Sequence, residues 1–335
     1  MRVGIIVPQG WTGEYDAWDP ARAWARTVAV AHGAEALGFD SIWMFDHVQT
    51  EPVPTDEITF EAFTGISALA VETARVRLGH LVLCAGYRNP ALAAKMISTL
   101  DVISGGRAEL GLGAGWKEDE YLAYGFGFPP LRSRMEMLED ALEIATRMLG
   151  GGRATYEGPA ARVRDAINVP RGLQEPRIPI LVGGNGPNRT WRLAARFADE
   201  LNLDWLTPEE VGAARPVIAA RCEELGRDPA TLRLSVNIGR EDTVRGGDVR
   251  VDLLRRYADA GVDRVMTLLT ASADDDGALE RFAEDCVAAG CELAGSLGRA
   301  SRGVPRGLTS AGRAHSCGRA GAVGELVAAP APLGG

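Results

Sequence analysis

The sequence lacks the features that mark membrane and secreted proteins. No apolar run approaches the roughly 18 residues that a membrane-spanning helix needs. The first ten residues have neither a basic start nor a signal-type apolar stretch. We therefore expect a cytoplasmic protein without a membrane partner.

Cysteine is scarce, and acidic residues outnumber basic ones. The five cysteines among 335 residues form no CxxC pair, which indicates reduced core thiols rather than a disulfide framework. The net charge of −9 argues against nucleic acid or an anionic membrane as a main partner. With 46% hydrophobic and 24% charged residues, the composition is that of an ordinary globular protein.

Several catalytic motifs are also missing. There is no HExxH and no cluster of histidine and cysteine at ligand spacing, so no metal site is predicted. There is no P-loop and no GxSxG. The turn after the first predicted strand reads Pro8-Gln9-Gly10-Trp11, which is not the GxGxxG of a doubly wound dinucleotide-binding fold.

What the sequence does contain is a repeated alternation of short β-type runs with helical patterns. Eight such pairs predict a parallel sheet closed into a (β/α)₈ TIM barrel. The predicted strands are 3–7, 41–45, 77–83, 108–112, 180–182, 200–203, 232–238 and 265–269. The predicted helices are 18–37, 59–73, 89–104, 133–149, 188–197, 208–225, 248–260 and 276–291.

Two regions fall outside this alternation. Residues 150–177 are an insertion between the fourth helix and the fifth strand, rich in Gly, Pro and Arg. Residues 295–335 hold ten glycines and five arginines but one acidic residue, Glu325. Because no apolar periodicity remains there, we expect a barrel over residues 1–294 followed by a disordered tail.

In a barrel, functional residues lie where strands end and helices begin. Asp46 and His47 follow the second strand, and a histidine there can exchange a proton near neutral pH. Either residue could equally be part of an ordinary polar strand end. Arg88 and the helix start at Asn89 follow the third strand, where they could meet an anion or simply cap the helix.

Glycine-rich loops follow the fourth and fifth strands. The segments 111–116 and 183–186 expose backbone that a flat ring or a phosphate can approach closely. Between them, residues 117–130 read as an aromatic loop that could cover a substrate or pack on the barrel rim. Glycines at both places suggest one extended ligand that crosses the barrel mouth.

The order of these segments resembles the luciferase-like family. The matching segments are 41–47, 87–90, 100–107, 111–116, 179–184 and 193–199. The resemblance covers about residues 1–293. Residues 46–62 are similar to an actinobacterial subgroup of that family known as F420-dependent oxidoreductases.

The resemblance implies a barrel that holds coenzyme F420, or alternatively FMN, at its mouth. It implies a bulge at Leu81-Val82, often with a cis peptide bond, behind the cofactor ring. It also places Asp46 and His47, as catalytic residues, near the redox-active edge of that ring. The cofactor contacts implied are Asp46, Leu81, Val82, Arg88, Asn89, Gly113, Ala114, Gly115, Trp116, Gly183, Gly184, Asn185 and Gly186.

Three functions follow from the resemblance. The leading one is F420-dependent hydride transfer to or from a small organic substrate, with His47 handling the proton. The second is an FMN monooxygenase served by a separate flavin reductase, and the third is a non-catalytic flavin-binding protein. The protein partners expected are a second copy of the chain in a homodimer and, indirectly, a flavin or F420 reductase. The sugar-phosphate dehydrogenase branch has a tryptophan near the position of Glu51 and an acid at the position of Trp116. Both differences count against a sugar-phosphate substrate.

Overall fold

The computed structural model describes residues 1–239 and 245–294 of the chain. The expected disordered tail, residues 295–335, lies outside the described residues. Within the described part, no helix combines the length and the apolar character that a membrane span requires.

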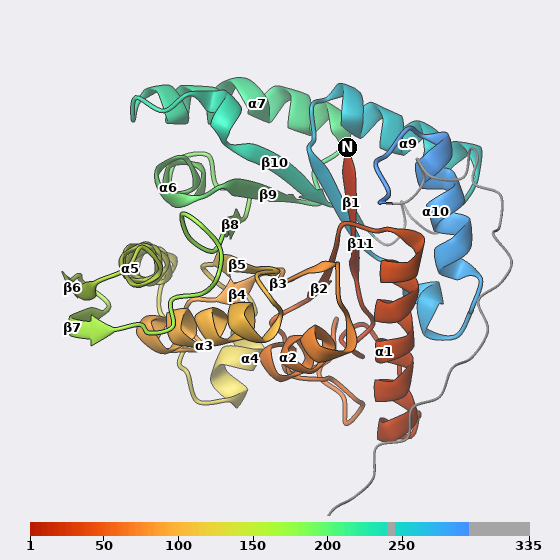
Figure 1. Cartoon of the computed structure of the whole chain (residues 1–335), viewed down its shortest axis with the longest axis horizontal. Coiled ribbons are helices and arrows are strands. Elements are labelled where there is room, and N and C mark those ends of the chain that lie inside the picture. Colours follow the sequence, from red (N-terminus) through yellow and green to blue (C-terminus); the bar gives the residue numbers. More distant parts are fainter. Residues whose placement is uncertain (240–244, 295–335) are drawn as a thin grey trace, which may run out of the picture. The chain divides into compact units, whose positions relative to one another are not determined.

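Parallel strands form a closed barrel at the centre of the fold (Figure 1). They are β1 (Arg2–Ile6), β2 (Ser41–Met44), β3 (Arg77–His80), β4 (Leu83–Cys84), β5 (Ala108–Gly113), β8 (Ile180–Gly183), β9 (Glu200–Asp204), β10 (Arg233–Asn237) and β11 (Arg264–Leu268). The order around the ring is β3-β2-β1-β11-β10-β9-β8-β5, and a pairing of β3 with β5 closes it. The short β4 pairs with β5 beyond the end of β3. It therefore shares one of eight barrel positions with β3, and the predicted TIM barrel is confirmed.

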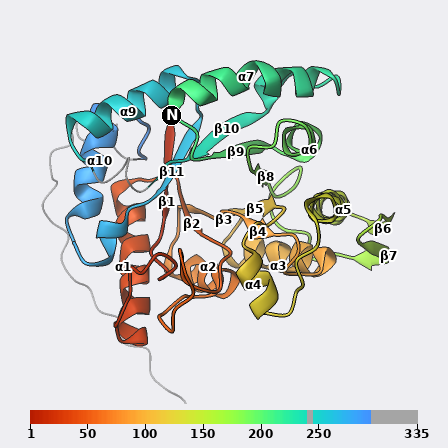
Figure 2. The same cartoon turned by 180° about the vertical axis from the view of Figure 1, so that it is seen from behind.

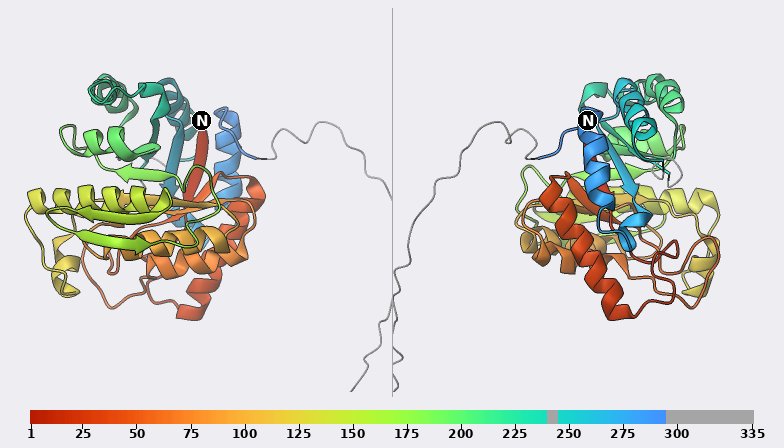
Figure 3. Two further views of the ribbon diagram at one scale, coloured as in Figure 1. Left: turned by 60° about the vertical axis from the view of Figure 1, so that its left-hand side comes forward. Right: turned by 90° about the vertical axis from the view of Figure 1, so that its right-hand side faces the viewer.

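Helices surround the barrel and follow its strands in chain order (Figures 1 and 2). They are α1 (Pro20–Leu37), α2 (Ala62–Glu72), α3 (Pro90–Ile103), α4 (Glu118–Ala123), α5 (Leu131–Leu149), α6 (Thr190–Phe197), α7 (Pro208–Glu223), α9 (Asp248–Asp259) and α10 (Ala278–Ala288), with 3₁₀ turns η1 (Pro229–Thr231) and η2 (Thr270–Ala273). Apart from α4, each packs against the next, and α10 returns to α1 (Figure 3).

Local sequence signals explain several helix ends. Asp19 caps α1 ahead of Pro20, and Gly38 ends it in the left-handed conformation with φ 85°, which glycine adopts at little cost. Asn89 caps α3, and Thr207 begins α7 with a capping box. The chain therefore turns from strand to helix at residues that satisfy the free backbone N–H groups.

The barrel interior is built around Trp43, which is fully buried. A Cβ atom on Gly79 would lie 2.2 Å from its ring, and one on Gly4 would lie 2.8 Å from its Nε1. Both strands therefore need glycine where the indole crosses the barrel. Trp43 Nε1 donates a hydrogen bond to Ser41 Oγ at 2.9 Å, so the indole nitrogen is satisfied.

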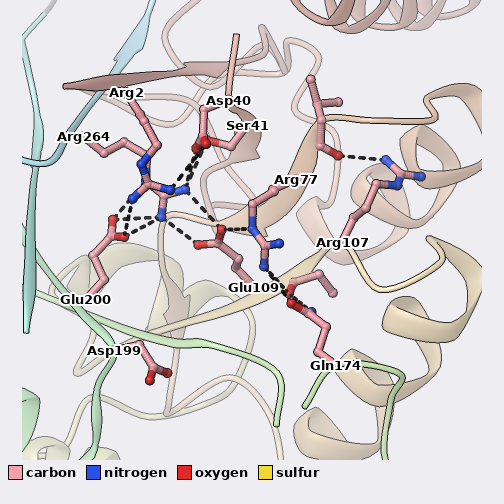
Figure 4. A network of polar contacts seen from close by, with 12 residues as sticks. Arg2, Asp40, Ser41, Arg77, Arg107, Glu109, Gln174, Asp199, Glu200 and Arg264 are labelled. Atoms are coloured by element: carbon pink, nitrogen blue, oxygen red, sulfur yellow. Dashed lines mark hydrogen bonds and ion pairs between the residues drawn. The ribbon is translucent and has the colours of Figure 1, made fainter. Parts of the chain in front are cut away.

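A buried ion network closes the barrel at the amino ends of its strands (Figure 4). Arg264, with no solvent exposure, donates to Glu109 at 2.7 Å, to Glu200 at 2.8 Å and to Asp40 at 2.9 Å. Arg77 adds a further ion pair to Glu109. Burial raises the pKa of Glu109, but the two arginines outweigh this effect and hold that pKa well below its usual range.

The structure differs from the sequence prediction in three places. The third strand does not run unbroken through residues 77–83 but divides into β3 and β4. The region 117–130, read as a loop, contains the short helix α4. The insertion at 150–177 forms an antiparallel hairpin of β6 (Arg153–Glu157) and β7 (Arg162–Ile167) that packs against α5.

The buried network gives a test of stability. Arg264→Met should lower the free energy of unfolding by about 3–5 kcal/mol, because it leaves Glu109 and Glu200 without their shared cation. Urea denaturation followed by circular dichroism measures the loss. Arg171→Met, which removes an exposed pair with Glu175, should change stability little. Equal losses in the two variants would contradict a special role for the buried network.

Candidate functional site

A cavity of about 1010 Å³ opens at the carboxyl ends of the barrel strands. This is the end of a (β/α)₈ barrel where binding and catalytic residues collect. Most of the predicted site residues line the cavity. They are Asp46, His47, Leu81, Val82, Gly113, Ala114, Gly115, Trp116, Gly183, Gly184, Asn185 and Gly186.

Arg88 and Asn89 are not among the residues that line this cavity. The Arg88 guanidinium binds Asp46 at 2.7 and 2.8 Å and Glu61 at 2.7 Å. Asn89 Oδ1 accepts two backbone N–H bonds in the first turn of α3. The anions that Arg88 meets therefore belong to the chain itself, and Asn89 serves as a helix cap. These contacts do not support the predicted cofactor contact of either residue.

Asp46 anchors the cavity wall. Its two carboxylate oxygens accept from Arg88, and Oδ2 also accepts the backbone N–H of Cys84 at 2.8 Å. Because Cys84 lies in β4, the carboxylate links the end of β2 to the strand segment that follows the break in the third strand. Because both oxygens are engaged, Asp46 is suited to hold the wall in place rather than to transfer a proton. These contacts do not support the catalytic role predicted for Asp46.

His47 is held by a buried carboxylate that comes from α4. Glu120, with no solvent exposure, lies 2.8 Å from His47 Nδ1. It also accepts the backbone N–H groups of Val48 and Gln49, both at 3.1 Å, and the hydroxyl of Tyr87 at 3.0 Å. A carboxylate accepts only, so Nδ1 carries the proton in this pair. Nε2 is left as the nitrogen that can exchange a proton with a ligand.

Aromatic rings enclose the imidazole of His47. Trp11, which follows β1 and is buried, stacks on it with a centroid distance of 4.3 Å and an interplanar angle of 6°. Trp116 approaches edge-on at 5.7 Å and is 60% exposed, so it lies at the cavity rim. His47 can therefore rotate little without disturbing its neighbours.

Another part of the cavity wall is formed where the third strand breaks. The peptide bond Leu81-Val82 is cis, as the family resemblance implied. The Val82 side chain lies against two glycines, because a Cβ atom on Gly113 would come within 2.6 Å of it and one on Gly183 within 3.0 Å. These glycines are thus required first by the chain's own packing, and not only by the approach of a ligand.

The second glycine loop is tied to a neighbouring strand. Asn185 Nδ2 donates to the carbonyl of Asp204 at 2.7 Å, and Asn185 Oδ1 accepts the backbone N–H of Asp204 at 2.9 Å. A Cβ atom on Gly186 would lie 2.8 Å from Thr190 Oγ1, at the start of α6. The loop is therefore held in one position as it passes from β8 into α6.

Charged groups that the sequence analysis did not assign also line the cavity. Lys117, only 4% exposed, pairs with Glu51 at 2.6 Å and Asp119 at 3.1 Å. Asp204 accepts from Asn237 Nδ2 at 3.0 Å. Desolvation raises the pKa of Asp204 above its usual range, and this hydrogen bond opposes the rise. Asp204 ends β9, which is four ring positions from β2 in either direction, so it faces His47 across the mouth.

Comparison with known families gives one match over most of the chain. Residues 1–239 match the family described as luciferase-like monooxygenase. An uncharacterised protein of Mycobacterium tuberculosis is 30% identical over 277 residues, which cover 76% of this chain and 92% of that protein.

Two further similarities concern proteins whose names include coenzyme F420. An F420-dependent glucose-6-phosphate dehydrogenase of Microbacterium testaceum is 35% identical over 167 residues, or 50% of this chain. The chain spans about half the length of that relative, 48%. The structure of an F420-dependent secondary alcohol dehydrogenase with an F420-acetone adduct superposes with a TM-score of 0.73 at 17% identity, covering 86% of this chain and 98% of that one.

The cavity also contains a thiol whose reactivity can be tested. Burial raises the pKa of Cys84 from 9.0 to about 11, and the nearby Tyr121 hydroxyl, 2.9 Å from Sγ, opposes the rise. Two pKa units lower the thiolate fraction near neutral pH about a hundredfold. Iodoacetamide should therefore modify Cys84 at least about a hundredfold more slowly in the folded protein than in urea. Peptide mass spectrometry at pH 7.5 measures both rates, and equal rates would show that the folded protein presents a reactive thiolate.

Proposed function

The chain belongs to the luciferase-like monooxygenase family, and on that premise we propose that it is an F420-dependent oxidoreductase. It transfers a hydride between the deazaflavin and a small organic substrate. The single observation that carries the proposal is the His47–Glu120 pair at the mouth of the barrel. It supplies an oriented proton-exchanging group at the edge of a cavity large enough for a cofactor and a substrate.

The residues around the cavity fit a flat cofactor with a phosphorylated side chain. The Leu81-Val82 wall, edged by glycines on both sides, offers an apolar surface without projecting side chains from β5 or β8. The loop 183–186 leads into the amino terminus of α6, where backbone N–H groups favour an anion. We propose that Val82 would support the ring and that the two glycine loops would hold the phosphate.

The chain's own residues then supply orientation and proton transfer. When bound, coenzyme F420 provides the hydride-carrying centre of the reaction. His47 Nε2 gives or takes the proton that accompanies hydride transfer at the substrate oxygen or carbon. Glu120 holds the ring nitrogen on the other side. Trp11 and Trp116 limit the water that reaches the imidazole.

The charges of the cavity disfavour a sugar phosphate as the substrate. Lys117, the cation nearest to Glu51, is already neutralised by two carboxylates, and Asp204 adds negative charge on the opposite wall. A phosphate on a substrate held between these two walls would face the carboxylates of Glu51 and Asp204, and the cation beside them is already paired. We propose a neutral substrate for this reason.

A second candidate is an FMN monooxygenase that receives reduced flavin from a separate reductase. The word monooxygenase in the description of the family is the observation behind this alternative. A non-catalytic flavin-binding protein is a third, and the His47–Glu120 pair argues against it because a carrier needs no oriented proton donor.

The choice of cofactor is the first test. Purified protein titrated with coenzyme F420 should show saturable fluorescence quenching, with a dissociation constant in the micromolar range or lower. FMN should bind more weakly, because the deazaflavin also brings an anionic tail. Tight FMN binding together with no response to F420 would favour the monooxygenase.

The proton-transfer role of His47 is the second test. His47→Ala should lower turnover about 10²–10⁴-fold, the usual contribution of general acid–base catalysis. Cofactor affinity should change much less, because other loops hold the phosphate. His32→Ala, on the outer helix α1, serves as the matched control and should leave turnover unchanged.

Glu120 acts through His47, which a double-mutant cycle can show. Glu120→Gln should lower kcat at least about tenfold with little change in cofactor binding. The double variant of Glu120→Gln with His47→Ala should be no slower than His47→Ala alone, because the two side chains work as one unit. Additive losses would instead mean that Glu120 contributes separately from the imidazole.

A further inference from the structure

Three polar side chains of the cavity have no part in the proton transfer proposed above. Asn202 and Asp204 belong to β9, and Asn237 ends the neighbouring β10. Asp204 and Asn237 are paired in the strand register, and Asn202 lies two residues deeper along β9. Since β9 lies across the ring of strands from β2, these side chains form the side of the cavity that faces His47.

The amide nitrogens of the two asparagines are used within the protein. Asn237 Nδ2 donates to Asp204 Oδ1 at 3.0 Å, and a carboxylate oxygen accepts only. Asn202 Nδ2 donates to Ser235 Oγ at 3.0 Å and lies 3.9 Å from Met266 Sδ, which also only accepts. These partners fix the orientation of both amides, so each turns its oxygen away from them.

The oxygens of the three side chains lack a donor. Within residues 1–239 and 245–294, nothing donates to Asn202 Oδ1, Asn237 Oδ1 or Asp204 Oδ2. The asparagines are only 3% and 6% exposed, yet neither oxygen belongs to the described polar atoms that are sealed from solvent without a partner. Each therefore keeps contact with the cavity. Because a buried acceptor without a donor is costly, this side favours a ligand that brings donors.

Trp205, the residue after Asp204, adds an uncovered ring beside these acceptors. It lines the cavity, is 62% exposed, and in the described part of the chain no other ring or cation contacts its indole. Its φ is 56°, which a bulky residue adopts only at a cost and which is common at ligand sites. Its backbone N–H donates to the carbonyl of Asn237 at 2.9 Å, so the ring is held next to the acceptors.

The spacing of the acceptors defines the donors that they suit. Asp204 and Asn202 are two residues apart on one strand, which separates them by about 6–7 Å. A single ammonium group, whose hydrogen bonds of about 3 Å diverge at a tetrahedral angle, does not span both. Two separate donors on one molecule do. Hydroxyl groups are such donors, and a hydroxyl carbon is also one from which a hydride can be removed.

We propose that this group of four residues binds the substrate, and that the substrate is a neutral ring compound with at least two hydroxyl groups. The hydroxyls donate to the three oxygens, and the ring lies against the indole of Trp205. The proposal rests on the F420-dependent function proposed above, because it takes the occupant to be the substrate. The ring is either saturated or aromatic, and the test distinguishes the two.

The first experiment compares small ligands by saturation-transfer NMR, on the full chain with and without coenzyme F420. The saturated probes are cyclohexanol and cis-1,3-cyclohexanediol, and the aromatic probes are phenol and resorcinol. The diol of the preferred ring type should bind at least about threefold more tightly than its monool, because it makes one more hydrogen bond. Cyclohexylamine should bind more weakly than the diol. Equal affinity of diol and monool, or tighter binding of the amine, would overturn the proposal.

Asp204→Asn tests the acceptors with an isosteric change. Asn237 still needs an acceptor, so the new amide places its nitrogen where the unpaired Oδ2 was. The dissociation constant of the diol should rise about tenfold, and its advantage over the monool should disappear. Asp165→Asn is the matched control, because Asp165 lies on the hairpin outside the cavity lining and pairs with Arg153 at 3.8 Å. It should bind the diol as the wild type does.

Trp205→Asn tests the ring. Asparagine tolerates a positive φ better than tryptophan does, so the melting temperature should not fall. The diol and the monool should both bind roughly two- to tenfold more weakly, since the stacking surface is lost. A lower melting temperature with unchanged ligand affinity would mean that Trp205 only supports the turn after β9, and would overturn its part in the site.

The outcomes separate this inference from the proposed function. Diols that bind no better than monools, while coenzyme F420 still binds, would overturn the substrate site alone. Absence of F420 binding, with a diol preference that Asp204→Asn abolishes, would overturn the F420-dependent function and support the hydroxyl site. Equal losses of F420 and diol affinity in Asp204→Asn would assign the acceptors to the cofactor and overturn the substrate site.

Discussion

The candidate site depends on how the Asp46 carboxylate is held. Its contacts with Arg88 and with the N–H of Cys84 fix the end of β2 against the strand segment beyond the break at Leu81-Val82. His47 is the next residue along the chain, and Val82 lies two residues before Cys84. One buried ion pair therefore sets the distance between the proposed proton donor and the proposed cofactor wall. Since Arg88 also binds Glu61, ahead of α2, the arrangement is braced from outside the barrel.

The two ends of the barrel use charge in opposite ways. At the amino ends of the strands, Arg264, Glu109 and Glu200 are all buried and satisfy one another, so this end is sealed. At the carboxyl ends, aromatic rings line one side of the mouth and Asn202, Asp204 and Asn237 line another. Ligand chemistry is thereby confined to one end, and the polar side of the mouth stands opposite the imidazole.

The sequence predicted the fold and most of the cavity lining because both depend on local signals. Strand and helix periodicity, the cap at Asn89 and the glycine segments are each readable within a few residues. The sequence did not reveal that Glu120 would hold His47, since 73 residues separate them and the intervening aromatic segment showed no helical pattern. The role of Arg88 was missed for the same reason, because its partners Asp46 and Glu61 lie on other elements. The Arg264 network likewise forms only when distant strands close into a ring.

The contact of Val82 with Gly113 and Gly183 has a consequence for changing the specificity of this protein. The Val82 side chain fills the space that a side chain at either glycine would need. A larger residue at position 113 or 183 would therefore require a smaller one at position 82. A single substitution at either glycine would therefore disturb the packing of this wall. Leu131 and Trp205, both 62% exposed at the rim, have no such restriction. A library that aims to accept new substrates should therefore vary the rim and leave the wall as it is.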